Sequence, residues 1–226
     1  MDFANNTCTI KSSANTSTVI LELFDTKLWH QWPIGRDEHL AGQSETKDDI
    51  VYNYNNLGWR DQEFAGEIGI VGDSFVFGLG TTHAFPHILK VDNLGMPSAS
   101  NDRIVRHAIQ YIRNYEPHTV IVCWTYGWRR EWIQPDGKVY SFKRLDKELK
   151  PMDEHMAELQ NQHYDNYNYY KNKLLIESFC AVNKVKLIQI DNHYITNDAE
   201  GTDNKHPGQN WHNRMAKEVK KLINAE

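Results

Sequence analysis

Two short segments of this chain carry residue types that together can perform nucleophilic catalysis. Ser74 ends the tripeptide Gly72-Asp73-Ser74, and Asp203 stands three residues before His206 near the C-terminus. A carboxylate at that spacing can fold back to accept the Nδ1 proton of the histidine, which leaves Nε2 to take the proton of a serine. The sequence therefore predicts Ser74 as nucleophile, His206 as base and Asp203 as its orienting group. Asp73 is expected to shape the turn rather than to move a proton.

The segments around these residues predict strands that alternate with helices. The first β-branched run closes on Gly72, which places Ser74 at the carboxyl end of a strand, where open α/β sheets bind ligands. The alternation implies a mainly parallel sheet covered on both faces, an α/β class fold with the three layers of an α/β/α sandwich. Strands are expected over residues 67–71, 89–94, 119–124 and 184–191, and helices over 101–112, 152–183 and 209–223.

The first part of the chain does not follow this pattern. Residues 1–55 are polar apart from two short apolar runs, 19–24 and 50–52. We expect them to form an N-terminal extension of unknown role, with strands or loops packed on the same domain. A chain of 226 residues can bury one substantial core, so residues 56–226 are expected to form a single main domain.

Four segments match a known set of sequence blocks. They are Asn55-Asn56-Leu57-Gly58-Trp59-Arg60, Ile70-Val71-Gly72-Asp73-Ser74, Asn93-Leu94-Gly95 and Asp203-Asn204-Lys205-His206. In these blocks the chain resembles the SGNH hydrolases, also called the GDSL esterase/lipase family, over roughly residues 55–226. The resemblance implies a flavodoxin-like α/β/α sandwich and serine-dependent hydrolysis of esters or transfer of acyl groups. It also implies that the N–H groups of Ser74 and Gly95 bind the oxyanion.

One block of that family is missing. After the strand that ends at Trp124, the family has an asparagine whose side chain helps to bind the oxyanion, and this chain has none there. Thr125 at the strand end and Asn101 at a helix start are two candidate replacements. Loss of one such donor costs on the order of 10²–10³ in rate. A degenerate site that no longer turns over is a further alternative.

An aromatic cluster follows the same strand. Trp124, Tyr126 and Trp128 are candidate substrate-binding residues, since aromatic faces can stack on a sugar ring or line an acyl pocket. Packing in the core or in a loop is the more common role of aromatic residues. Arg129 and Arg130 could bind an acidic sugar or pair with Glu131, and a salt-bridged surface is the more common explanation.

Composition and charge exclude several classes of protein. A formal net charge of −5 gives no basic surface for a nucleic acid. No apolar run approaches the ~18 residues that span a bilayer, and the first residues lack a secretion signal, so no membrane partner and a cytoplasmic location are expected. Pro86 interrupts the spacing of His83 and His87, and no carboxylate or cysteine lies beside them, so neither a metal nor a cofactor is expected.

These features predict an esterase that acts on a small-molecule or carbohydrate ester, with an O-deacetylase as one specific form. An O-acyltransferase could use the same Ser74, Asp203 and His206, and would differ by excluding water. A non-catalytic SGNH-fold binding or structural protein is the third reading. The missing asparagine favours it, and the intact serine, aspartate and histidine oppose it.

Overall fold

The computed structural model describes residues 8–11, 16–19, 40–133, 139–142, 162–191, 201–203 and 205–225. Contacts divide the chain into two units, Met1–Ile34 and Gly35–Glu226. In the first unit, β1 (Cys8–Lys11) and β2 (Thr16–Val19) pair in antiparallel fashion. The predicted start of the long helix, residues 152–161, and most of the apolar run 19–24 lie outside the described residues.

The second unit is built on a parallel sheet, which in the described part of the chain has four strands. They are β5 (Ile68–Gly72), β6 (Asp92–Gly95), β7 (Thr119–Trp124) and β10 (Lys186–Asp191), in the spatial order β10-β7-β5-β6. Numbered along the chain this order is 2-1-3-4 from the β6 edge, as in flavodoxin-like sheets. The chain passes from β5 to β6 on one side and then crosses to β7 on the other side of β5, and sheets of this order bind ligands at such a switch point, beyond the carboxyl ends of the strands.

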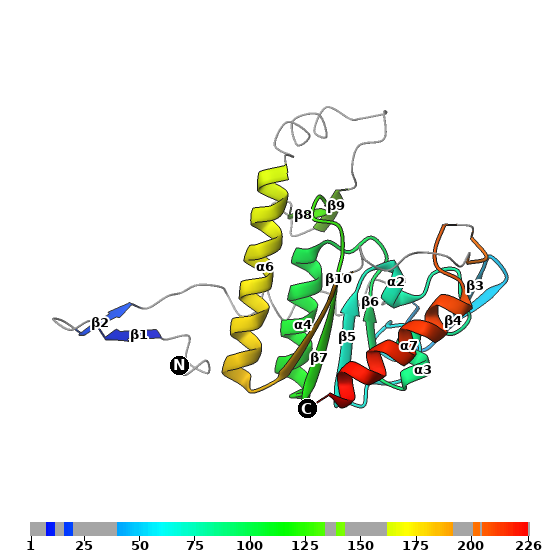
Figure 1. Ribbon diagram of the computed structural model, residues 1–226, viewed down its shortest axis with the longest axis horizontal. Helices are drawn as coiled ribbons and strands as arrows, with labels where there is room; N and C mark the ends of the chain where they lie inside the picture. Colours follow the sequence, from blue (N-terminus) through cyan, green and yellow to red (C-terminus); the bar gives the residue numbers. More distant parts are fainter. Residues whose placement is uncertain are drawn as a thin grey trace. The chain divides into compact units, whose positions relative to one another are not determined.

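Helices cover both faces of this sheet, as Figure 1 shows. On one face lie α4 (Asn101–Tyr115) and α6 (Gln162–Asn183), and on the other lie α3 (Phe85–Leu89) and α7 (Gln209–Asn224). Consecutive residues of β5 point to opposite faces: Gly69 lies directly against Tyr111 of α4, whereas Ile70 packs with the α7 side. The predicted α/β/α sandwich is thereby confirmed.

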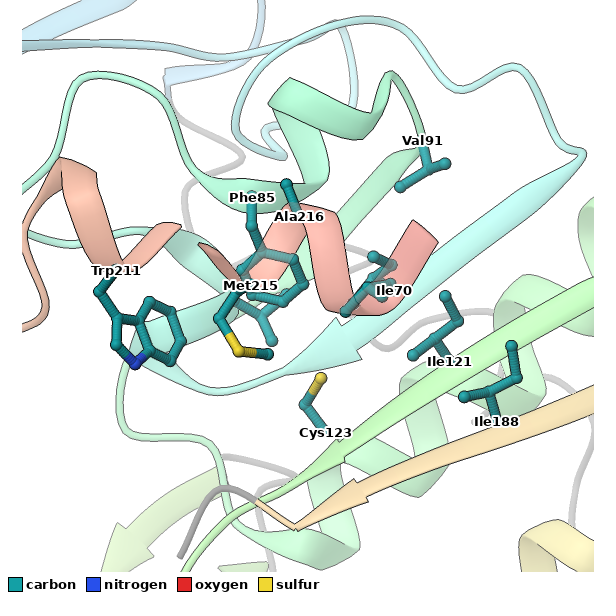
Figure 2. Packing of buried hydrophobic residues seen from close by; sticks show 11 residues of the cluster. Ile70, Phe85, Val91, Ile121, Cys123, Ile188, Trp211, Met215 and Ala216 are labelled. Carbon is teal, nitrogen blue, oxygen red and sulfur yellow. The ribbon is translucent and has the colours of Figure 1, made fainter. Parts of the chain in front are cut away.

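The main core lies between the sheet and helices α3 and α7. Ile70, Ile121 and Ile188 occupy three neighbouring strands, and Phe85 and Met215 pack against them from the helices (Figure 2). Ile70 and Ile121 are fully buried. Each fully buried side chain of this size contributes roughly 1.5–3 kcal/mol. This packing holds α7, and with it the loop that precedes α7, against the strand that leads to Ser74.

Two hairpins accompany the sheet. β3 (Ser44–Lys47) pairs with β4 (Ile50–Asn53), and β8 (Arg130–Ile133) pairs with β9 (Val139–Phe142), both antiparallel. Ile50, Tyr52 and Tyr54 are buried and cluster with Phe77, which ends the short helix α2 (Ser74–Phe77). Part of the segment 1–55 therefore packs beside the helix that begins with Ser74. That the whole segment packs on this domain stays a prediction.

Two strands begin later than the sequence indicates. Lys90 and Lys184 have φ values of 58° and 57°, in the left-handed region that often ends a helix. Lys90 caps α3, so β6 begins at Asp92 rather than at residue 89. Lys184 follows the end of α6, so β10 begins at Lys186 rather than at residue 184. In both cases local helix termination overrides an apolar run that looks like a strand.

Candidate active site

Ser74 is the first residue of α2 and follows β5 through a single linking residue, Asp73. Asp73 is the N-cap of the helix, and its Oδ1 accepts a hydrogen bond of 3.0 Å from the backbone N–H of Phe75. The helix ends at Gly78, whose φ of 81° is one that other residues rarely adopt. Ser74 is 4% exposed. The nucleophile predicted from the sequence therefore lies at the carboxyl end of the sheet, as expected for a strand-to-helix turn.

The second carboxylate oxygen of Asp73 joins this turn to the end of β7. Asp73 Oδ2 accepts hydrogen bonds from Thr125 Oγ1 at 2.6 Å and from Arg129 Nη1 at 2.7 Å. Arg129 Nη1 also donates to Thr125 Oγ1 at 2.9 Å. All three side chains are largely buried, so each contact replaces water on a polar group that needs a partner. The Arg129 contact with Asp73 was missed by sequence reasoning, which paired Arg129 with Glu131 or an acidic sugar.

Asn101 and Thr125 form a second buried pair beside this network. The Asn101 side chain accepts from Thr125 N at 3.0 Å and donates to Thr125 O at 3.2 Å, which holds the chain where it leaves β7. The only hydroxyl proton of Thr125 is donated to Asp73. Both residues therefore lie beside the turn that carries Ser74, with their polar groups engaged in positioning the backbone.

Gly95 lies directly against α2. A Cβ atom at this position would overlap the backbone nitrogen of Phe77, so only glycine allows the strand and the helix to approach this closely. The Gly95 N–H donates to Asn93 Oδ1 at 2.9 Å, and Asn93 Nδ2 in turn donates to Asp61 at 3.2 Å. The predicted oxyanion donor thus already has an acceptor within the chain.

Asp203 and His206 form a hydrogen-bonded pair. His206 Nδ1 and Asp203 Oδ2 are 2.5 Å apart, and Asp203 Oδ1 accepts from the backbone N–H groups of Lys205 and His206 at 3.0 and 2.9 Å. Burial raises the pKa of the Asp203 carboxyl, but these hydrogen bonds outweigh it, so the pKa lies below its ordinary value. Asp203 is therefore anionic at neutral pH, and His206 Nε2 is left available for another partner.

The loop that carries this pair docks on the segment after α2. Thr202 N donates to Gly80 O at 3.0 Å, and Gly80 approaches Asp203 so closely that a Cβ there would lie 2.9 Å from Asp203 Oδ1. The imidazole of His206 also meets the ring of Phe75 edge-on, at 6.0 Å between centroids. Since Phe75 is the residue after Ser74, the pair lies beside the nucleophile. In the part of the chain that the structure describes, no hydrogen bond joins Ser74 Oγ to His206.

Arg60 stabilises the segment after α2, which is the segment that the Asp203–His206 loop contacts. Its guanidinium is 1% exposed and donates to the carbonyl oxygens of Phe77, Gly78, Thr81 and Thr82. The Asn55 side chain organises the preceding turn by accepting from Leu57 N and Trp59 N, both at 3.0 Å. The lead-in motif that ends at Arg60 was visible in the sequence. Its purpose was not, because the carbonyl groups that it satisfies lie about twenty residues further along the chain.

The three aromatic candidates have different environments. Trp124 is fully buried, donates from Nε1 to Gln189 at 3.0 Å and packs on Tyr169, so it has no surface with which to contact a substrate. Tyr126 is 42% exposed, and its ring stacks on Trp128 at 5.3 Å between centroids. The Arg129 guanidinium lies over both rings, at 5.3 and 5.6 Å from their centroids. Of the three candidates, Tyr126 and Trp128 therefore present aromatic surface beside Arg129, and Trp124 does not.

Charged neighbours of Arg129 pair elsewhere. Glu131 pairs with Arg103 and Arg106 of α4, and Arg130 pairs with Asp165 of α6. These ion pairs fasten the start of β8 to both helices on that face of the sheet. The pairing of Glu131 with Arg129 or Arg130 that the sequence suggested is not the one found.

Other side chains that sequence analysis considered lie apart from this site. His83 and His87 stack on one another at 5.0 Å between ring centroids. The described residues contain no group of three or more His, Cys, Asp or Glu side chains arranged to hold a metal ion. Among these same residues no helix has the length and apolar composition that crossing a membrane requires.

Comparisons with known proteins leave the site to be interpreted from its geometry. No protein-family model and no curated protein matches the chain. Among solved structures, it is similar to a protein from Bacteroides ovatus whose name describes it as a GDSL-like lipase, with 15% identity and a TM-score of 0.39. The similar region covers 76% of this chain and 56% of that one. A similarity of this size supports no argument about function.

Proposed function

We propose that this protein is a serine-dependent hydrolase of carboxylic esters that forms an acyl-enzyme on Ser74. The observation that carries the proposal is the Asp203–His206 pair at 2.5 Å on a loop docked against the segment after α2. A histidine whose Nδ1 is held by a carboxylate has its Nε2 free to act as a base. Ser74, at the carboxyl end of β5 and next to Phe75, carries the hydroxyl that the pair would serve.

The reaction would proceed in two balanced halves. In the first, Ser74 Oγ bonds to the ester carbonyl carbon while its proton passes to His206 Nε2, and the carbonyl electron pair moves onto oxygen. The bond to the alkoxide then breaks, and the alkoxide leaves as an alcohol with the proton from His206. In the second half, water bonds to the acyl carbon and gives a proton to His206 Nε2. The bond from that carbon to Ser74 Oγ then breaks, Ser74 Oγ takes the proton back from His206, and the carboxylic acid leaves. Asp203 stabilises the imidazolium in both halves.

The proposed substrate is a small or carbohydrate-linked ester, with O-deacetylation as its specific form. The stacked pair of Tyr126 and Trp128 supports this choice, because aromatic faces at the edge of a site bind sugar rings. An O-acyltransferase would use the same steps with a sugar hydroxyl in place of water. Partition of the acyl group between water and an added sugar, measured as free acetate against acetylated sugar, separates these two activities.

A non-catalytic protein of the same fold is the rival, and two observations favour it. The polar groups of Thr125 and Asn101 are engaged with one another and with Asp73, and the N–H of Gly95 is engaged with Asn93. Three of the four donors that the sequence suggested for the oxyanion thus have internal partners, and the N–H of Ser74 is the fourth. A protein with no oxyanion donor would bind an ester without accelerating its hydrolysis.

Turnover of p-nitrophenyl acetate by the full chain and by Ser74→Ala tests the proposal. We expect hydrolysis that the variant loses, and covalent labelling by a fluorophosphonate at Ser74 that peptide mass spectrometry locates. Ser178→Ala, which removes an exposed hydroxyl from α6, is the matched control and should retain both signals. Equal turnover by the native chain and Ser74→Ala, together with no labelling of folded protein, would remove the esterase proposal.

A further inference from the structure

One nitrogen of the Arg129 guanidinium makes two hydrogen bonds, while another has no acceptor among the described residues. Nη1 donates to Asp73 and Thr125, at 2.7 and 2.9 Å. Nε is buried and has no hydrogen-bond partner among the described residues. A guanidinium presents its Nε–H and one Nη2–H side by side, in a fork that matches two oxygens of an anion. A buried donor without an acceptor is uncommon, which suggests a ligand that supplies one.

The Arg129 guanidinium is held by the residue that precedes Ser74 in the chain. Asp73 and Thr125 hold one end of the group, and the rings of Tyr126 and Trp128 lie beneath it. Asp73 is the residue next to Ser74, and consecutive Cα atoms lie about 3.8 Å apart. A donor fixed in this way before the reaction loses little free energy to reorganisation when negative charge develops beside it.

From these contacts we infer that Arg129 is the anion-binding group of the site and, in the proposed ester hydrolysis on which this inference rests, donates to the oxyanion of the tetrahedral intermediate. Arg129 then does what the missing third-block asparagine would have done. The other candidates are less suited, because Thr125 has no second proton to donate and the N–H of Gly95 already has an acceptor. The positive charge of Arg129 adds to the hydrogen bond, since it opposes the charge that develops on the carbonyl oxygen.

Steady-state kinetics of Arg129→Met on p-nitrophenyl acetate measure this role. We expect kcat to fall by about 10²–10³ with little change in KM, because the donor acts on the transition state and not on the bound ester. Arg130→Met is the matched control: it removes the neighbouring arginine, which pairs with Asp165, and should keep the native kcat. Thermal midpoints are measured for both variants, so that a loss of folding is not read as a loss of catalysis.

Chemical rescue separates catalysis from structural support. Millimolar guanidinium chloride should restore part of the activity of Arg129→Ala, and urea at the same concentration should not. A purely structural arginine would show no such difference. If kcat of Arg129→Met is no lower than kcat of Arg130→Met, the inference is overturned, while the Ser74-dependent activity remains. A rise in KM confined to acidic esters, with kcat unchanged, would overturn the oxyanion role as well.

A readout that needs no turnover distinguishes failure of this inference from failure of the proposed function. In Ser74→Ala, titration with sodium acetate should shift the NMR signal of the Arg129 Nε–H, and sodium chloride should not. A shift without any Ser74-dependent hydrolysis would remove the esterase proposal and support Arg129 as an anion-binding group. Ser74-dependent hydrolysis without a shift would retain the esterase and remove the role of Arg129.

Discussion

The chain leaves β5 and β7 at the same edge of the sheet, yet the two strand ends differ in what their polar groups are free to do. After β5, Ser74 begins a helix beside the Asp203–His206 pair, and His206 Nε2 is left for a further partner. After β7, the backbone N–H and C=O of Thr125 are hydrogen-bonded to the Asn101 amide, and its hydroxyl donates to Asp73. Residue types that could take part in catalysis occur at both strand ends. What separates a candidate catalytic group from a structural one is whether its hydrogen-bonding atoms are still available to a substrate.

The difference follows from the strand order. β5 lies between β6 and β7, so the loops that follow β5 and β7 meet at the point where the connections diverge. Asp73 lies at this meeting point and is buried, so both of its oxygens need donors. The loop after β7 supplies two of them, from Thr125 and Arg129. The one hydroxyl proton of Thr125 is used in this contact, whereas Nε of the larger Arg129 guanidinium has no acceptor in the part of the chain that the structure describes.

Asp203→Asn should have the largest effect on the β5 side of this comparison. An amide can donate as well as accept, so it can hold His206 in the wrong tautomer, and we expect kcat for p-nitrophenyl acetate to fall by about 10⁴. Glu218→Gln makes the same change of charge on the exposed surface of α7 and should leave kcat unchanged. Native turnover by Asp203→Asn would mean that the pair is only a loop contact.

Gly95→Ala should be the next most severe change, and it acts on stability. The new methyl group would overlap the backbone at Phe77, so we expect a loss of about 3 kcal/mol in the free energy of unfolding, measured by urea denaturation. Gly127→Ala in the loop after β7 is the control, since its nearest atom would lie 3.5 Å away. Its expected effect is within about 0.5 kcal/mol. Equal losses would show that Gly95 is packed no more tightly than Gly127.

Thr125→Val tests the β7 side directly. The variant keeps the shape of the side chain but removes a hydrogen bond to a buried carboxylate, which should cost about 2 kcal/mol of stability. Its kcat should change less than tenfold, because the hydroxyl positions Asp73 and does not contact the substrate. A tenfold change corresponds to about 1.4 kcal/mol of activation free energy. Thr125→Ser, which keeps the hydroxyl, should retain the native stability. A drop of about 10² in kcat with a folded Thr125→Val would make Thr125 the oxyanion donor and break the comparison.

Acid stability should show the smallest effect. The pKa of Asp203 is lowered in the folded state, so its contribution to stability is fully present above the ordinary value of 3.8 and is lost as pH falls through the folded value. We expect the free energy of unfolding of the native chain to fall relative to Asp203→Asn in this window, by less than about 1 kcal/mol because the pair is partly exposed. A difference that grows above pH 5 instead would contradict the assigned pKa direction.

Local sequence patterns were sufficient for most of the sheet and the long helices. The strand β7 has the predicted limits, and α4 begins at the predicted residue because Ser100 caps it, with its side chain accepting from Arg103 N. The helix α3 was not anticipated, since five residues that include Pro86 carry too little periodicity to indicate one. The hairpin of β8 and β9 was also missed, although Pro135-Asp136-Gly137 between its two strands is a sequence typical of a turn.

By itself the sequence determined which residue types stand at strand ends and that an α/β/α sandwich would carry them, because burial periodicity and glycine turns are local properties. Only the tertiary structure decided which polar groups are occupied. The Asn101–Thr125 pair, the Asp73–Arg129 contact and the grip of Arg60 on the carbonyl groups after α2 all join residues distant in sequence. No spacing rule links such residues, since their hydrogen bonds depend on which strands become neighbours and on which groups are buried together.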